Sequence, residues 1–259
     1  MLLNIEGKSL AVDAVGEGKP IVFIHGFPLD RRMWRGQIEE FSKNHKLIAV
    51  DLPGFGESGP SPDVMTMEDY ATDVVAVLDE LGIAEAVTLC GLSMGGYIAF
   101  AFYRAYRERV GRLILCDTKA VADSDEKRTE RHATAERALA EGTEFLIEGM
   151  IPKMVAAGAD AGVIAEMEKM VRTASPGGVA AALRGMAERE DSTELLSRIN
   201  VPTLVICGAE DQFSPPEEMR PMAEAIPGSR FEVVPGAGHV SPLEKPAGVN
   251  RAIGAFLLG

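Results

Sequence analysis

Short apolar runs, rich in β-branched residues, recur along the chain and alternate with segments of helical period. They cover residues 20–26, 46–54, 86–91, 111–118, 202–208 and 230–236. Runs that are apolar on both faces are typical of strands in a parallel sheet covered by helices. The intervening stretch "TMEDYATDVVAVLDELG" repeats its apolar residues every three or four positions, as an amphipathic helix does. The pattern therefore predicts an α/β fold with a mostly parallel central sheet flanked by helices.

Two segments depart from this alternation. Near the N-terminus, "LLNIEGKSLAVDAVG" predicts a β-hairpin with Gly7 in its turn. Residues 119–195 contain no β-like run, are rich in Ala, Glu, Arg and Met, and divide into about four helical pieces at Gly142, Gly158 and residues 175–178. We therefore expect an α/β core formed by residues 1–118 and 196–259. Residues 119–195 would form a helical insertion after the sixth strand.

Composition and charge narrow the class of protein. A chain of 259 residues with 46% hydrophobic content can bury one large core. The net charge of −13 disfavours nucleic acid and anionic membrane surfaces as partners. No apolar run approaches the ~18 residues of a membrane span, and no signal-peptide pattern begins the chain, so we expect a soluble, cytoplasmic protein. Three cysteines each end an apolar run, which predicts buried thiols without a disulfide or metal cluster: Cys90, Cys116 and Cys207.

The stretch "VTLCGLSMGGYIAF", residues 87–100, carries the most informative local pattern. A strand pattern runs into Gly91, and a helix can start directly after Ser93. Glycines at positions 91 and 95 allow a tight turn, from which Ser93 would project at a helix N-terminus. A helix-capping role would explain Ser93 alone but not the glycines on both sides. We therefore interpret Ser93 as a nucleophile.

A serine nucleophile needs a base that takes its proton. His45 and His132 lie in polar, charged stretches and are expected to be solvated. His25 follows an apolar run directly, a position suited to holding a loop. His239 lies on a glycine-rich loop after the last strand pattern, where it can reach the carboxyl edge of the sheet. We therefore choose His239 as the base.

The base in turn needs a carboxylate, and the oxyanion needs two backbone N–H donors. Glu210 and Asp211 follow one strand pattern and Asp117 follows another, so all three carboxylates could lie at the same edge. Asp117 is expected instead to cap or brace the entry to the helical insertion. The turn geometry gives the Met94 N–H as one oxyanion donor, and the loop "HGFPLD" gives the Phe27 N–H as the other. Alone, "HGFP" would be interpreted as an ordinary Gly/Pro loop.

Five motifs follow one another along the chain: "HGFP" (25–28), "DLPGFGES" (51–58), "GLSMGG" (91–96), "GAEDQFSP" (208–215) and "GAGHVSPLEKP" (236–246). In this order they resemble the α/β-hydrolase fold family, almost end to end. The resemblance implies the chain order Ser, acid, His and an acid within a G-x-x-D pattern, which selects Asp211 over Glu210. It also implies that residues 119–195 form the family's helical lid. Haloalkane dehalogenases and epoxide hydrolases of this fold use an aspartate where this chain has Ser93, so these activities are not expected.

Within the family, "GLSMGG", "LILCDTKA" and "TASPGGVAAALRGMAERED" are similar to 3-oxoadipate enol-lactonases and related esterases. In contrast, "HGFPLD" and "GHVSPLEKP" are more similar to general esterases, proline iminopeptidases and cofactor-free perhydrolases. We therefore expect a serine esterase for small to medium acyl substrates first and an enol-lactonase second. A perhydrolase or a ligand-binding protein on this fold are further alternatives. The partner is a small-molecule ester or lactone, no cofactor or metal is expected, and the oligomeric state is left open.

The substrate pocket is expected between the oxyanion loop and the helical insertion. Met150 and Met154 are flexible apolar side chains suited to lining it, although filling the insertion's own core explains them equally well. Trp34 is expected to face the substrate, with packing of the first helix as the alternative. A substrate with a second carboxylate would need a cation, and the candidates are Lys119, Arg31 and Arg32.

Overall fold

The computed structural model describes all 259 residues and contains one eight-stranded sheet in the order β1-β2-β4-β3-β5-β6-β7-β8. The strands are β1 (Leu2–Ile5), β2 (Lys8–Val15), β3 (Pro20–Ile24), β4 (Lys46–Val50), β5 (Val87–Leu92), β6 (Val110–Cys116), β7 (Thr203–Gly208) and β8 (Arg230–Val234). The pairs β1–β2 and β2–β4 are antiparallel, and the other pairs are parallel. The predicted mostly parallel sheet is confirmed.

The first two strands form the predicted hairpin. They pair from Leu2 opposite Ala11 to Ile5 opposite Lys8. The two turn residues, Glu6 and Gly7, have φ angles of 51° and 84°. Two consecutive left-handed residues match the twist of an antiparallel pair, and glycine accepts this conformation without steric cost.

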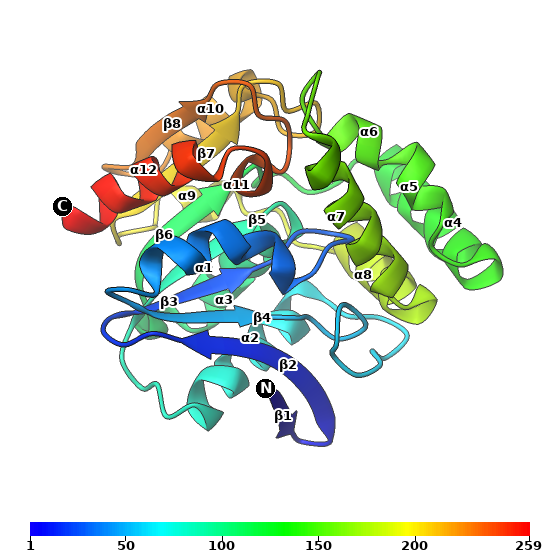
Figure 1. Ribbon diagram of the computed structural model, residues 1–259, viewed down its shortest axis with the longest axis horizontal. Helices are drawn as coiled ribbons and strands as arrows, with labels where there is room; N and C mark the ends of the chain where they lie inside the picture. Colours follow the sequence, from blue (N-terminus) through cyan, green and yellow to red (C-terminus); the bar gives the residue numbers. More distant parts are fainter.

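Helices cover both faces of the sheet (Figure 1). The helices of the core are η1 (Arg31–Trp34), α1 (Arg35–Phe41), α2 (Met67–Glu80), α3 (Met94–Ala105), η2 (Arg107–Arg109), α10 (Pro216–Glu224), α11 (Ser241–Glu244) and α12 (Pro246–Leu258). α1 and α12 pack against each other on one face, and α2 and α3 do so on the other. Because both faces are covered, every residue of β3, β5 and β7 is buried.

Six helices form the segment between β6 and β7. They are α4 (Asp125–Glu141), α5 (Phe145–Gly149), α6 (Ile151–Met154), α7 (Ala161–Thr173), α8 (Pro176–Ala187) and α9 (Thr193–Leu196). The predicted breaks are present: Gly142 ends α4 with φ 84°, Gly158 precedes α7 with φ 79°, and Ser175 caps α8. Two further breaks are present: Met150 separates α5 from α6, and residues 188–192 separate α8 from α9.

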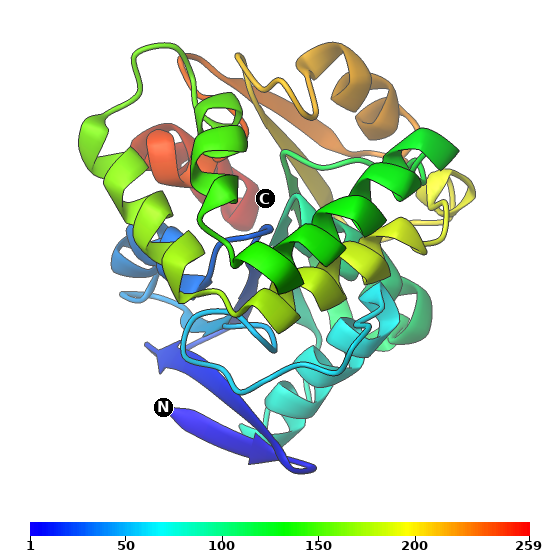
Figure 2. The same cartoon turned by 90° about the vertical axis from the view of Figure 1, so that its right-hand side faces the viewer.

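The longer helices of this segment gather on one side of the molecule. Figures 1 and 2 show α4, α7 and α8 together beyond the edge of the sheet, with α4 packed against α8. We propose that residues 119–195 act as a lid, and we call them the helical segment below. None of the helices in the chain is long and apolar enough to span a membrane.

Candidate active site

The turn between β5 and α3 consists of a single residue. β5 ends at Leu92 and α3 begins at Met94, and Ser93 between them has φ 53° and ψ −112°. A positive φ is uncommon for a residue other than glycine and marks stored strain. The end of β6 holds this conformation, because the Ser93 N–H donates to the Cys116 carbonyl at 3.0 Å and the Thr118 hydroxyl donates to the Ser93 carbonyl at 2.8 Å. The Ser93 side chain makes no capping bond to α3 and is free for other contacts.

Two glycines allow the turn to be this tight. A Cβ at Gly91 would collide with the Gly95 carbonyl oxygen, and a Cβ at Gly95 would collide with the Ile24 carbonyl oxygen. The start of α3 therefore lies directly against the end of β3. This close approach explains the glycines on both sides of Ser93. A serine that only capped the helix would not require them.

The structure brings Ser93, His239 and Asp211 together. The His239 Nε2 lies 2.8 Å from the Ser93 Oγ, and its Nδ1 lies 2.9 Å and 3.0 Å from the two Asp211 carboxylate oxygens. The three residues follow β5, β8 and β7, whose carboxyl ends share one edge of the sheet. Asp211 and His239 are both buried, so the interaction between them is little screened by water.

Asp211 is held as an acceptor. Its Oδ1 accepts from the Phe213 N–H at 2.7 Å and from the Ser214 N–H at 3.0 Å. Burial raises the pKa of Asp211. The charge of His239 and the hydrogen bonds from His239, Ser214 and Phe213 lower this pKa by more than burial raises it, so the net pKa lies below its usual value. An ionised Asp211 accepts the Nδ1 proton of His239, which leaves Nε2 as an acceptor toward the Ser93 hydroxyl.

The other histidines lie outside this cluster. The His25 Nε2 accepts from the Leu52 N–H at 3.0 Å, so its proton is on Nδ1 and points to the Gly26 carbonyl at 3.0 Å. Burial lowers the pKa of His25. It joins two loops, as its position in the sequence suggested. His45 and His132 do not line the cavity described below.

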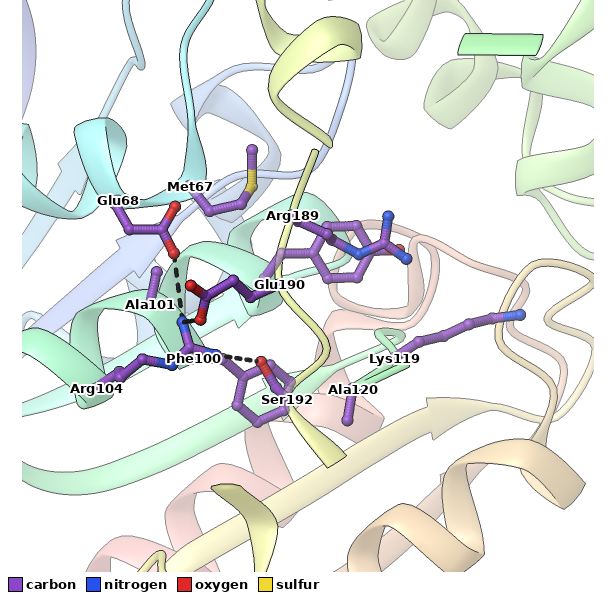
Figure 3. Close-up of a pocket in the computed structure, with 11 residues that line it drawn as sticks. Met67, Glu68, Phe100, Ala101, Arg104, Lys119, Ala120, Arg189, Glu190 and Ser192 are labelled. Atoms are coloured by element: carbon purple, nitrogen blue, oxygen red, sulfur yellow. Dashed lines mark hydrogen bonds and ion pairs between the residues drawn. The ribbon is translucent and has the colours of Figure 1, made fainter. Parts of the chain in front are cut away.

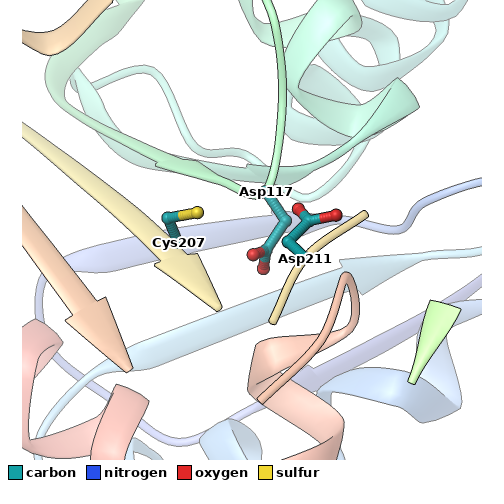
Figure 4. Close-up of side chains that lie close together, drawn as sticks. All are labelled: Asp117, Cys207 and Asp211. Carbon is teal, nitrogen blue, oxygen red and sulfur yellow. The ribbon is translucent and has the colours of Figure 1, made fainter. Parts of the chain in front are cut away.

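Asp117 stands just before the helical segment, but its side chain turns to the core near the cluster and does not cap or brace the entry to that segment, as we expected it to do. Its carboxylate accepts from the Gly208 N–H at 2.7 Å and from the Ser241 hydroxyl at 2.6 Å. It therefore connects the end of β7 to the His239 loop, close to Asp211 (Figure 4). Burial raises the pKa of Asp117 well above its usual value, and the nearby charge of Asp211 raises it further.

Asp117, Asp211 and Cys207 place their side-chain donor atoms within 4.8 Å of one another (Figure 4). This donor set does not fit a metal ion. Both side-chain carboxyl groups already accept the hydrogen bonds described above. The Cys207 thiol lies 3.2 Å from both the Gly208 and the Ser214 carbonyl oxygens, and its one hydrogen can be donated to either. A thiol must lose its proton to bind a metal, but burial raises the pKa of Cys207. The three side chains hold loops in place.

The two backbone N–H groups that we proposed as oxyanion donors belong to Met94 and Phe27. Met94 is the first residue of α3, so its N–H has no acceptor within the helix. The Phe27 N–H donates to no backbone carbonyl. A Cβ built on Gly26 would lie 3.4 Å from the Ser93 Cβ, so the loop that carries Phe27 runs next to Ser93. Both groups can therefore face a carbonyl oxygen bound at Ser93.

Ser93, His239 and Phe27 open into a cavity of about 840 Å³ between the sheet edge and the helical segment. This volume lies within the range of ~300–1,000 Å³ that is usual for small-molecule sites. The apolar side chains of its wall include Phe145, Leu146, Met150, Leu183, Met186, Leu196, Phe213 and Met222. α4 contributes polar side chains to the same wall. The cavity can hold an extended, largely apolar group next to Ser93.

Comparisons with known proteins identify the family. Residues 19–246 match the family model of the alpha/beta hydrolase fold. The chain belongs to this family. A solved structure of a thermophilic esterase from Thermogutta terrifontis, with malate bound, is 46% identical with a TM-score of 0.97, covering 100% of this chain and 97% of that one.

Enol-lactonases are also similar to this hydrolase. The solved enol-lactonase from Burkholderia xenovorans LB400 is 28% identical with a TM-score of 0.91, covering all of both chains. Among curated proteins, 3-oxoadipate enol-lactonase 2 of Acinetobacter baylyi is 27% identical over 92% of this chain and 88% of its own.

Two of the expected substrate contacts of this hydrolase are core residues. Trp34 is fully buried and packs against Phe23, with ring centroids 5.0 Å apart, so it has no surface facing the cavity. Met154 is also fully buried and does not line the cavity. Met150 does line it. The packing alternatives therefore hold for Trp34 and Met154.

None of the cations suggested by the sequence is free to bind a substrate carboxylate. Lys119 lines the cavity but pairs with Glu218 at 2.6 Å, and neither Arg31 nor Arg32 lines it. The other cations of the wall are also ion-paired, except Lys153. We missed Lys153, although it lies between the two methionines of "MIPKM" that we singled out.

A second, much smaller hollow lies beside the cavity (Figure 3). Its volume is about 10 Å³, room for a single water molecule at most. Arg104 of α3 pairs there with Glu68 at 3.3 Å and Glu190 at 3.5 Å, and it donates to the Ser192 hydroxyl at 3.0 Å. These bonds attach the end of the helical segment to α2 and α3, so this hollow is part of the scaffold.

Proposed function

We propose that this protein is a serine hydrolase that cleaves carboxylic esters of small to medium acyl substrates through an acyl-enzyme. The observation that carries the proposal is the hydrogen-bonded series Ser93, His239, Asp211, which opens into the large cavity. The likeness to an esterase over the whole chain supports it.

The geometry suits each step of ester hydrolysis. His239 Nε2 takes the proton of the Ser93 hydroxyl as Oγ attacks the ester carbonyl carbon. The N–H groups of Phe27 and Met94 stabilise the negative charge on the carbonyl oxygen, and the positive end of α3 adds to this effect. His239 then gives its proton to the leaving alcohol, and the acyl group stays on Oγ.

A water molecule completes the cycle. His239 takes one of its protons as the oxygen attacks the acyl carbon, and the returned proton restores the Ser93 hydroxyl as the carboxylic acid leaves. Asp211 stays ionised throughout and stabilises the imidazolium. The cavity wall of Leu, Met and Phe side chains suits an acyl chain of several carbons.

Lactone hydrolysis is the second candidate. Two enol-lactonases are 27% and 28% identical to this chain over nearly its whole length. The same residues would open an enol-lactone, with the enol oxygen as the leaving group. Lys153 favours this candidate, because it is a cation on the cavity wall without an ion-pair partner and could receive a substrate carboxylate.

Hydrolysis of p-nitrophenyl esters from acetate to decanoate, with 3-oxoadipate enol-lactone in parallel, tests the proposal. Wild type is compared with Ser93→Ala and with Ser197→Ala, an exposed serine outside the cavity, as control. Ester turnover that only the first variant loses supports the esterase. Turnover of the lactone alone supports the second candidate. If neither compound is hydrolysed, or if Ser93→Ala matches wild type, the Ser93 mechanism is refuted and a ligand-binding role takes its place.

A further inference from the structure

The helical segment touches the His239 loop through its backbone. The Met154 carbonyl accepts from the His239 N–H at 2.7 Å. A Cβ built on Gly238 would lie 2.7 Å from the Ala156 nitrogen, 2.7 Å from the Val155 carbonyl carbon and 2.8 Å from the Met154 oxygen. Only a glycine permits such an approach, so residues 154–156 lie flat against the residue that precedes the proposed base.

The Glu244 carboxylate joins the His239 loop to residues 154–156 of the helical segment. Glu244 Oε1 accepts from the Gly238 N–H at 2.7 Å, and its Oε2 accepts from the Ala156 N–H at 2.8 Å. Glu244 ends α11, the short helix that begins two residues after His239. Its side chain therefore reaches back past His239 to Gly238, the residue that precedes the proposed base. Both oxygens are used, one for each partner.

We propose that Glu244 is a positioning residue for the hydrolytic reaction, which holds the backbone around His239 and fastens the helical segment to it. This inference rests on the proposed function. Glu244 contacts neither the imidazole nor Ser93, so its effect would pass through the Gly238 and Ala156 N–H groups. A base that shifts by about 1 Å can lose on the order of 10²-fold in rate.

Other bonds hold the His239 loop to the core. The Glu210 N–H donates to the Ala237 carbonyl at 2.8 Å, and the Ser241 hydroxyl donates to Asp117. Gly208 lies so close to Ala237 and Gly238 that a Cβ there would collide with their carbonyl oxygens. Loss of the Glu244 bonds should therefore loosen the loop without unfolding the protein.

Glu244→Gln tests the inference because it preserves size but offers one acceptor oxygen for two N–H donors. Glu210→Gln is the matched control: its carboxylate accepts from the Ala157 N–H at 3.0 Å, in the same strip of the helical segment, but its side chain is exposed and does not bridge to the His239 loop. The turnover of p-nitrophenyl butyrate is measured per active site, with active sites counted by titration with a p-nitrophenyl phosphonate that labels Ser93. The pH profile of kcat/KM and the Tm accompany it.

We expect the turnover per active site of Glu244→Gln to fall about 10- to 100-fold, mostly in kcat, and its pH profile of kcat/KM to be displaced from that of wild type. The turnover of Glu210→Gln should stay within about twofold of wild type. An unchanged turnover per active site, even with a lower Tm, would make Glu244 a merely structural residue and overturn the inference. An equal loss in both variants would overturn it too.

If Glu244→Gln does not fold, a second variant tests the inference. Glu244→Asp keeps both carboxylate oxygens but is shorter by one methylene, so it cannot reach the Gly238 and Ala156 N–H groups together. A loss of kcat per active site supports the inference, and wild-type kcat overturns it. If wild type itself neither reacts with the phosphonate nor hydrolyses esters, the proposed function fails instead.

Discussion

Replacing Asp211 by Asn should reverse the tautomer of His239. Asp211 Oδ1 accepts from two backbone N–H groups, those of Phe213 and Ser214. Asparagine has a single acceptor oxygen, and these two donors fix it at the Oδ1 position. The amide nitrogen then takes the place of Oδ2, which lies 2.9 Å from His239 Nδ1.

The hydrogens of the new amide decide which imidazole nitrogen of His239 carries the proton. Oδ1 also lies 3.0 Å from Nδ1, but it already accepts from two backbone N–H groups, whereas the amide NH₂ at the Oδ2 position needs an acceptor. This arrangement favours Nδ1 as the acceptor, with the imidazole proton on Nε2. That proton points at the Ser93 Oγ, 2.8 Å away, where wild type has the acceptor that takes the serine proton. The variant therefore keeps the shape of the site but lacks a base in the required form. We expect kcat to fall about 10⁴-fold, or about 5.5 kcal/mol at ~1.36 kcal/mol per tenfold change.

The assay is kcat for p-nitrophenyl butyrate at neutral pH, with Glu210→Gln as the control. Glu210 is the neighbouring carboxylate, but its side chain is exposed and contacts the helical segment, so its loss should change kcat little. The Tm of both variants shows whether the fold is kept. A kcat of Asp211→Asn within tenfold of wild type would show that this carboxylate does not set the tautomer, and the reasoning would be refuted.

Three further changes give distinct readouts. Gly95→Ala should cost about 1–3 kcal/mol of stability and most of the activity, because the new Cβ meets the Ile24 carbonyl; Gly177→Ala in α8, with nothing within 4 Å, is the control for thermal unfolding. Asp117→Asn tests a pH dependence. Because burial and the charge of Asp211 raise the pKa of Asp117, its contribution to stability is present at acidic pH and is lost as the pH rises through that raised value. The Tm of this variant relative to wild type should therefore increase from about pH 5 to pH 9, and a constant difference would contradict the shift. Lys153→Met should raise the KM of mono-p-nitrophenyl glutarate about two- to fivefold and leave that of p-nitrophenyl butyrate unchanged; equal effects on both esters would exclude a carboxylate contact.

The fold could be predicted because its central strands are buried on both faces. Every residue of β7, for example, is buried, and a run such as "TLVICG" has few other interpretations. The hairpin turn has a direct signal in Gly7, which takes a positive φ of 84° that glycine accepts without steric cost. The break at Met150 was missed, although Pro152 gives a signal there: it lies in the first turn of α6, where a proline is tolerated because its missing N–H needs no partner.

The candidate site could be located for a related reason. Ser93, Asp211 and His239 each follow a strand, so the topology alone brings them to one edge. The side chains that line the cavity depend on the packing of helices and are less accessible to such reasoning. Met150 and Met154 would share a face of one continuous helix, but the chain breaks at Met150, and only this residue lines the cavity.

Glu244 shows where sequence reasoning ends and how the helical segment bears on the proposed reaction. One of its partners, Gly238, lies in the same motif, but the other, Ala156, is 88 residues away in a segment whose docking no local pattern encodes. The residues proposed for chemistry come from the sheet edge, whereas part of what holds His239 comes from the helical segment, through the Met154 carbonyl and the Ala156 N–H. Substitutions in this segment can therefore change the rate of the reaction without touching the substrate, because they act on the backbone that carries the base.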